Sequence, residues 1–146
     1  MLKIPIERIK ESQCFFNVFE TILCNLQYFD KKYKVAIGLV RYSNNLKTLF
    51  IHCYITNNNG EVKYDLSEYY LAEKPIEYIN LKLIKGKEYF DNILKVIQNG
   101  SGGYINIENY IFTTIQKELE NFYETNNLDI TAIKSNIILL NNIFIY

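Results

Sequence analysis

The sequence predicts an α+β fold in which one helix packs on a small antiparallel sheet and additional helices follow toward the C-terminus. Apolar residues recur at three- and four-residue intervals over residues 13–29, and residues 33–66 show the patterns of strands joined by tight turns. The chain has 146 residues, of which 49% are hydrophobic, so it is long enough to bury a core. We expect one domain over residues 1–146 and exclude intrinsic disorder.

The first half of the chain gives the clearest elements. The apolar stripe predicts a helix over residues 13–29, and the alternation over residues 33–42 predicts a strand. A second strand over residues 48–56 is apolar on both faces. It forms a hairpin with residues 61–66 through the Asn-Gly sequence at the end of residues 57–60.

The second half is predicted to be mainly helical. After a strand over residues 76–84, helices are expected over residues 87–98 and 106–126. A last helix is expected over residues 129–143, although the terminal IFIY sequence suits a strand equally well. The glycine-rich residues 99–103 follow a helix and lack a GKS/T sequence, so we interpret them as a linker turn rather than a phosphate-binding loop.

Composition excludes several classes of function. Sixteen basic residues balance sixteen acidic ones, so the chain lacks the basic field that binds nucleic acid. No run approaches the roughly 20 apolar residues of a membrane helix, and the charged first ten residues do not form a signal peptide, so we expect a cytoplasmic protein. Three cysteines, one histidine and no CxxC sequence argue against disulfides and a structural metal, and we expect no cofactor.

His52 is the only histidine, so any imidazole-based mechanism must use it. The hairpin register decides whether Asp65 can reach it, because strand side chains alternate between faces. A two-residue turn places Asp65 opposite Tyr54 and diagonal to His52, and a four-residue loop places Asp65 directly opposite His52. A three-residue loop would place Asp65 opposite Cys53, on the wrong face.

The candidate nucleophile is Cys14. It stands at the expected helix start, where unpaired backbone amides and the helix dipole favour a thiolate. Cys24 lies about 15 Å farther along the same helix, and Cys53 points away from His52, so both are expected to be core residues. The residues predict a site of Cys14, His52 and Asp65. The competing interpretation is a structural cysteine beside a buried histidine.

Three segments together resemble the papain-like and transglutaminase-like cysteine superfamily: QCFFNVFETILCNL, AIGLVRY and LFIHCYITNNNGEVKYDLS. Cys14 matches the nucleophile at the helix start, and residues 52–54 match the HAW-like strand. Residues 60–65 match the G-x-V-x-D element, which ends at Asp65. The resemblance covers about residues 12–67, less than half of the chain, and implies a papain-like domain whose nucleophile helix packs on an antiparallel sheet.

This resemblance implies an acyl-enzyme on Cys14, with His52 as general base and then acid and Asp65 orienting the imidazole. Release to water gives a peptidase or deamidase, and release to an amine gives amide formation from a thioester, as in bacterial biosynthetic relatives. The implied substrate is a peptide, a protein or a carrier-bound acyl group. The family's second oxyanion donor is not placed, because Gln13 directly adjoins the cysteine, and Tyr54 replaces the usual Trp.

Two further hypotheses stay open. The missing oxyanion side chain suits a catalytically inactive papain-like module that binds a peptide or protein. The apolar stripes of residues 106–145 suit a homodimer. Nucleic acid and membrane are not among the expected partners.

Overall fold

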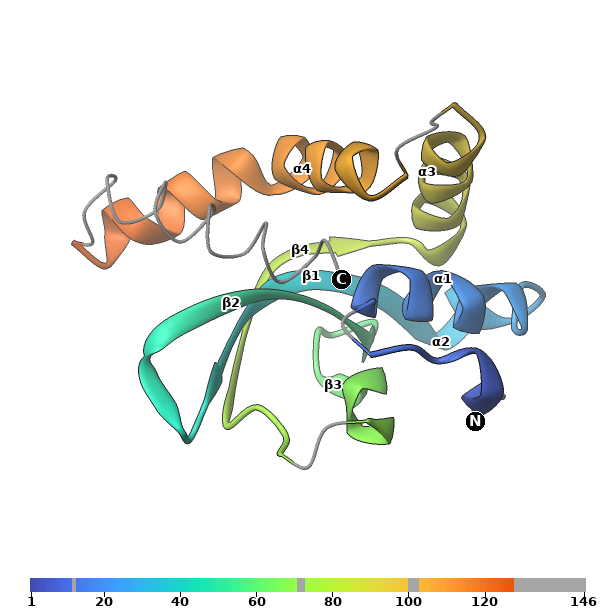
Figure 1. Ribbon diagram of the computed structural model, residues 1–146, viewed down its shortest axis with the longest axis horizontal. Helices are drawn as coiled ribbons and strands as arrows, with labels where there is room; N and C mark the ends of the chain where they lie inside the picture. The colour runs from blue at the N-terminus through green and yellow to red at the C-terminus, as the bar shows by residue number, and fades with distance from the viewer. Residues whose placement is uncertain (12, 71–72, 100–102, 128–146) are drawn as a thin grey trace.

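One curled antiparallel sheet in the strand order β3-β2-β1-β4 forms the frame of the computed structural model (Figure 1). The strands are β1 (Tyr33–Tyr42), β2 (Asn45–Asn57), β3 (Val62–Tyr64) and β4 (Glu77–Ile84). The structure describes residues 1–11, 13–70, 73–99 and 103–127. The strands predicted over residues 33–42 and 76–84 are confirmed, and the α+β class is as expected.

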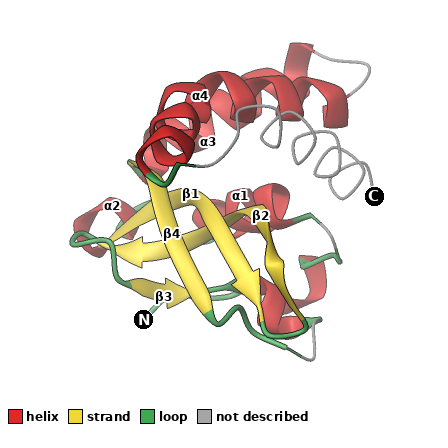
Figure 2. Ribbon diagram, turned by 90° about the vertical axis from the view of Figure 1, so that its left-hand side faces the viewer, coloured by secondary structure: helices red, strands yellow, loops and turns green. Residues whose placement is uncertain are grey.

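Helices pack against this sheet, with α3 and α4 together on one side and α1 beside them (Figure 2). They are α1 (Cys14–Leu23), α2 (Phe29–Lys32), α3 (Gly86–Asn99) and α4 (Gly103–Thr125), with the 3-10 turns η1 (Ile6–Arg8) and η2 (Leu66–Tyr69). The two long C-terminal helices agree with the sequence pattern. The helix predicted over residues 129–143 lies outside the described residues, as does most of the linker turn at residues 99–103. None of the described helices is both long and apolar enough to cross a membrane.

The first helix is shorter than the prediction of residues 13–29. It ends at Leu23 because the Asn25 side chain donates to the Thr21 carbonyl oxygen at 2.6 Å. The same amide binds the N-terminal segment, with Nδ2 donating to the Lys3 carbonyl at 2.9 Å and Oδ1 accepting from the Lys3 amide at 3.0 Å. A side chain that competes for backbone groups in this way ends a helix even where the apolar period continues.

The two faces of the sheet belong to different apolar clusters. Ile37, Leu39 and Cys53 pack with α1, α3 and α4 in the main core. The alternate residues Ala36 and Tyr54 are fully buried on the other face, which is the concave one. Residues that follow one another along a strand therefore face separate environments, as the period of two requires.

Gly38 lies where the sheet curls. A Cβ atom there would collide with the Tyr54 hydroxyl and with the Ile79 carbonyl oxygen of the neighbouring strand. The pairing of β1 with β4 also shifts register between Ile37 and Gly38. A bulge beside a residue without a side chain lets a sheet bend sharply.

The curl brings the two edges of the sheet close to each other. β3 and β4 are at opposite ends of the strand order, yet the Tyr78 hydroxyl of β4 donates to Asp65 Oδ2 at 2.7 Å. Asn80 Nδ2, also on β4, donates to the Gly60 carbonyl oxygen at 2.8 Å. We call these two hydrogen bonds the seam. They join β4 to the chain on either side of β3.

We expect Gly38→Ala to lower the free energy of unfolding by about 1 to 3 kcal/mol, the usual cost of overpacking. Urea unfolding followed by circular dichroism measures it. Adding Tyr54→Phe should recover only part of the loss, because the Ile79 carbonyl belongs to the backbone of β4 and cannot turn aside. An unchanged stability of Gly38→Ala would contradict this account of the curl.

Candidate functional site

The hairpin between β2 and β3 has a three-residue loop. The Asn57 amide donates to the Glu61 carbonyl at 2.9 Å, and the Gly60 amide donates to the Asn57 carbonyl at 3.1 Å. Gly60 has a φ of +87°, the left-handed conformation that ends this type of loop. Both even-numbered loops expected from the sequence are therefore wrong.

A bulge in β3 reverses the effect of this loop. Thr56 pairs with Val62, but the next pair is Ile55 with Tyr64, so Lys63 is an extra residue in β3. Continued by one residue, the shifted register places Asp65 opposite Tyr54 rather than Cys53. Two one-residue shifts cancel, and Asp65 lies on the same face as the histidine.

The structure brings His52 and Asp65 into direct contact. The imidazole Nε2 lies 2.8 Å from Asp65 Oδ1, and each of the two residues is only 6% exposed. Two donors from Ser67 also bind Oδ1, the backbone amide at 3.0 Å and the hydroxyl at 2.6 Å. The carboxylate thus caps η2 while it holds the imidazole.

Several donors keep Asp65 ionised in spite of its burial. Burial alone would raise the pKa of this carboxyl group, but hydrogen bonding and charge attraction from His52 outweigh it. Hydrogen bonds from Ser67 and Tyr78 act in the same direction. The pKa of Asp65 is held well below its ordinary value of 3.8.

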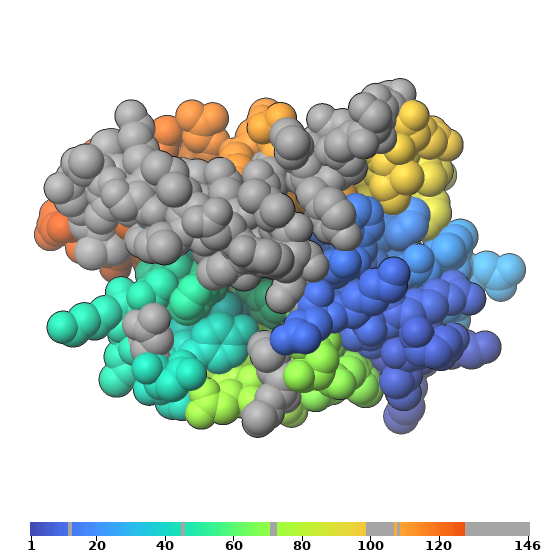
Figure 3. Space-filling view, viewed as in Figure 1, coloured from blue at the N-terminus to red at the C-terminus, as the bar shows by residue number. Residues whose placement is uncertain are grey.

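Cys14 is the first residue of α1 and is 6% exposed. β3 pairs with β2 only at Ile55 and Thr56, so it ends before the level of His52. α1 packs on β2 and on η2, and this places the start of the helix beside the histidine. N-terminal residues and η2 adjoin on the molecular surface shown in Figure 3.

The imidazole lies between the thiol and the carboxylate. Asp65 occupies Nε2, so Nδ1 is the ring nitrogen left to hydrogen-bond with Cys14. Burial lowers the pKa of His52, but hydrogen bonds and charges of Asp65 and Cys14 raise it to about 10. The arrangement favours an imidazolium, which donates from both nitrogens.

The other two cysteines lie outside this cluster. Cys53 is 1% exposed on the opposite face of β2, where its Sγ donates to the Tyr89 hydroxyl at 3.6 Å, and burial raises the pKa of its thiol. Its predicted packing role agrees with this position. Cys24 caps the C-terminus of α1 and is half-buried. The expectation that it is a core residue is wrong, because the helix ends before it.

The structure also shows where Gln13 and Tyr54 lie, the two residues at which the sequence departs from the papain-like pattern. Gln13 is the N-cap residue of α1. Tyr54 is buried on the concave face, and its hydroxyl donates to Asn80 Oδ1 at 2.5 Å.

Sequence reasoning missed Ser67 and Tyr78. The Asp-x-Ser sequence at residues 65–67 is a recognisable capping signal, so Ser67 was open to prediction. Tyr78 lies thirteen residues from Asp65, and nothing in its local sequence marks it. Its contact with Asp65 exists only because the sheet curls.

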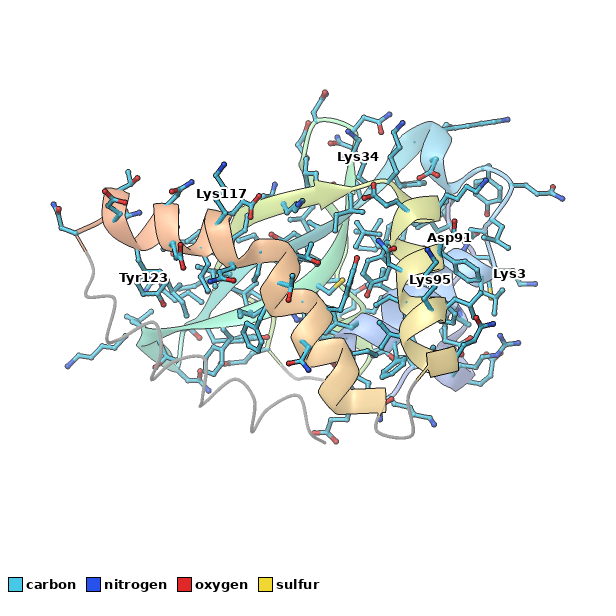
Figure 4. The ribbon with its side chains drawn as sticks, turned by 90° about the horizontal axis from the view of Figure 1, so that it is seen from above. Lys3, Lys34, Asp91, Lys95, Lys117 and Tyr123 are labelled. Carbon is cyan, nitrogen blue, oxygen red and sulfur yellow. The ribbon has the colours of Figure 1, made fainter. Side chains whose placement is uncertain are left out.

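A separate charged hollow of about 640 Å³ lies between α2, the start of β1 and α3. Lys34, Asp91 and Lys95, which contribute to its lining, are labelled in Figure 4. The hollow contains neither Cys14 nor His52 in its lining. Within the described ranges, no group of three or more His, Cys, Asp or Glu residues is arranged to hold a metal ion.

Comparisons with protein-family models, with curated proteins and with solved structures find no match for this chain. A thiol, an imidazole and an ionised carboxylate in this order can generate a nucleophilic thiolate.

The His52–Asp65 pair makes stability depend on pH. The pKa of His52 is raised from 6.5 to about 10. Its contribution to the free energy of unfolding is therefore complete below pH 6.5 and is lost as the pH rises toward 10. Because the pKa of Asp65 is lowered, its contribution is complete above 3.8 and is lost as the pH falls below that value.

We expect Asp65→Asn to lower the free energy of unfolding by about 3 to 5 kcal/mol near pH 6. The variant leaves the buried imidazolium of His52 without its charged partner. The difference should shrink as the pH approaches about 10, where His52 loses its proton in the folded state. Urea unfolding of both proteins at matched pH values measures it. A difference that stays constant from about pH 6 to 10 contradicts the ion pair.

Proposed function

We propose that this protein is a thiol-dependent acyl-transfer enzyme that forms a covalent intermediate on Cys14. The observation that carries the proposal is the position of the buried His52 ring, which contacts Asp65 on one side and Cys14 on the other. Cysteine nucleophiles are activated by an imidazole that a third group orients. The order of these residues on helix, strand and following turn also supports the resemblance to papain-like and transglutaminase-like enzymes.

In the first step, the Cys14 thiolate attacks the acyl carbon of an amide or thioester. A bond forms between sulfur and carbon, and the carbonyl electron pair moves to oxygen. When the tetrahedral intermediate collapses, the bond to the leaving group breaks and the His52 imidazolium gives that group its proton. Neutral His52 then removes a proton from the incoming water or amine, which takes the acyl group and frees Cys14.

The developing oxyanion needs hydrogen-bond donors. The backbone amide of Cys14 is the first amide of α1. The amides of the first helical turn have no acceptor within their own helix. We assign this amide as one donor, because a backbone N–H at the nucleophile is well placed for negative charge on the acyl oxygen.

The acceptor decides which reaction results. Water gives amide hydrolysis, as in a peptidase or deamidase, and an amine gives amide formation from a thioester. The acyl donors proposed for the site are a peptide, a protein or a carrier-bound acyl group.

A second candidate is a catalytically inactive module of the same type that binds a peptide or protein. The observation that favours it is burial, since Cys14, His52 and Asp65 are each only 6% exposed. A substrate must reach the thiol for catalysis, whereas a binding module has no such requirement.

Limiting iodoacetamide at about pH 6, with the label located by mass spectrometry, distinguishes the two candidates. If Cys14 is an activated thiolate, it should react faster than Cys24, although Cys24 is the more exposed thiol. His52→Ala should slow the labelling of Cys14 roughly a hundredfold and leave that of Cys24 unchanged.

An activated acyl ester should then leave one acyl group on Cys14 of the wild type and none on His52→Ala. A primary amine should release it faster than water does if the enzyme is an acyltransferase. Labelling confined to Cys24, with no dependence on His52, would reject the enzyme and favour the binding module.

A further inference from the structure

The two oxygens of the Asp65 carboxylate have unequal surroundings. Oδ1 receives three hydrogen bonds, one from the His52 ring and two from Ser67. Oδ2 receives one, from the Tyr78 hydroxyl at 2.7 Å, and no other donor to it is found in the described part of the chain. Loss of the Tyr78 hydroxyl would therefore remove the whole support of one oxygen, whereas loss of the Ser67 hydroxyl would leave Oδ1 with two donors.

Tyr78 is itself held firmly. It lies opposite Val40 in the pairing of β4 with β1, and its ring packs edge-on against Tyr54 with the ring centroids 4.9 Å apart. Burial, together with hydrogen bonding and repulsion from Asp65, raises the pKa of the Tyr78 hydroxyl far above 10. The hydroxyl therefore stays protonated and acts as a donor at every pH at which the protein would work.

We infer that Tyr78 is a positioning residue that fixes the Asp65 carboxylate from the opposite edge of the sheet and sets the acidic limit of Cys14 reactivity. This inference rests on the proposed function. It adds a residue from β4 to a site whose other members come from α1, β2 and the turn after β3. It also connects the curl of the sheet with the chemistry of the site, because only the curl brings Tyr78 to Asp65.

The chemical consequence concerns protonation of Asp65. A hydroxyl that donates to a carboxylate stabilises the ionised form. Without Tyr78 the carboxylate takes up a proton at a higher pH, and the imidazolium then loses the partner that holds it. If alkylation of Cys14 depends on this imidazolium, as the proposed function requires, it should decline at a higher pH than in the wild type.

The test is the rate of Cys14 alkylation by iodoacetamide as a function of pH in wild type and in Tyr78→Phe. The variant keeps the ring against Tyr54 and removes only the hydroxyl. We expect the acidic limb of the profile to move up by about one pH unit, as expected for one hydrogen bond to a charged group. Circular dichroism at each pH verifies that the protein remains folded.

Asn80→Ala is the matched control for a purely architectural effect. It removes the other hydrogen bond of the seam, to Gly60, together with the acceptor of the Tyr54 hydroxyl, and Asn80 has no hydrogen bond to Asp65. We expect it to lower stability and to leave the acidic limb in place. If Asn80→Ala moves the limb as far as Tyr78→Phe does, the effect belongs to the closure of the sheet and the inference is wrong.

A double-mutant cycle separates action through Asp65 from other effects. In an Asp65→Asn background, Tyr78→Phe should produce no further shift of the limb. An equal shift in both backgrounds would overturn the inference. A second measurement needs no Tyr78 variant: the hydroxyl proton of Tyr78 should exchange slowly enough to be seen by NMR in the wild type, and a hydroxyl that exchanges as fast as that of an exposed tyrosine would also count against the inference.

The outcomes distinguish the inference from the proposed function. If Cys14 of the wild type reacts independently of His52, the proposed function fails. If that reaction depends on His52 but its acidic limb is the same in folded Tyr78→Phe, only the role of Tyr78 fails.

Discussion

The buried ion pair of His52 and Asp65 is the interaction on which the rest of the structure depends. Removing two charged groups from water is costly, and a close contact repays that cost only when the remaining polar atoms also find partners. Here Ser67 and Tyr78 donate hydrogen bonds to the carboxylate oxygens of Asp65, and Cys14 contacts the side of the imidazole that faces away from Asp65. Each of these partners comes from a different element, so the pair links α1, β2, η2 and β4.

The partners of this pair come together because the sheet curls. Gly38 leaves room for the Tyr54 hydroxyl and for the backbone of β4, and the bulge beside it bends β4 toward the far edge of the sheet. The short β3 ends before the level of His52, which leaves that part of β2 to the start of α1. The helix thus brings Cys14 to an imidazole on the concave face, while most of α1 packs with the main core.

Much of the fold follows from local patterns. Alternation predicts β1, and the helical period predicts α3 and α4, because each pattern reflects burial of one face. The early end of α1 was not predictable from that period, since it depends on the side chain of Asn25. The site shows the same contrast. The placement of His52 and Asp65 on one face was anticipated, but from the wrong loop lengths, and it occurs because the bulge at Lys63 cancels the shift of a three-residue loop. Tyr78 depends on tertiary curvature, which no local pattern encodes.

The central claim is that His52 is an imidazolium held between Asp65 and Cys14. Because the chain has only one histidine, the ring nitrogens can be observed without ambiguity by nitrogen-15 NMR across pH. The account predicts that both ring nitrogens of the wild type stay protonated well above pH 6.5, the ordinary pKa of histidine, and that Cys14→Ala brings the loss of the proton to lower pH. A neutral ring that titrates near 6.5 in both proteins would contradict it.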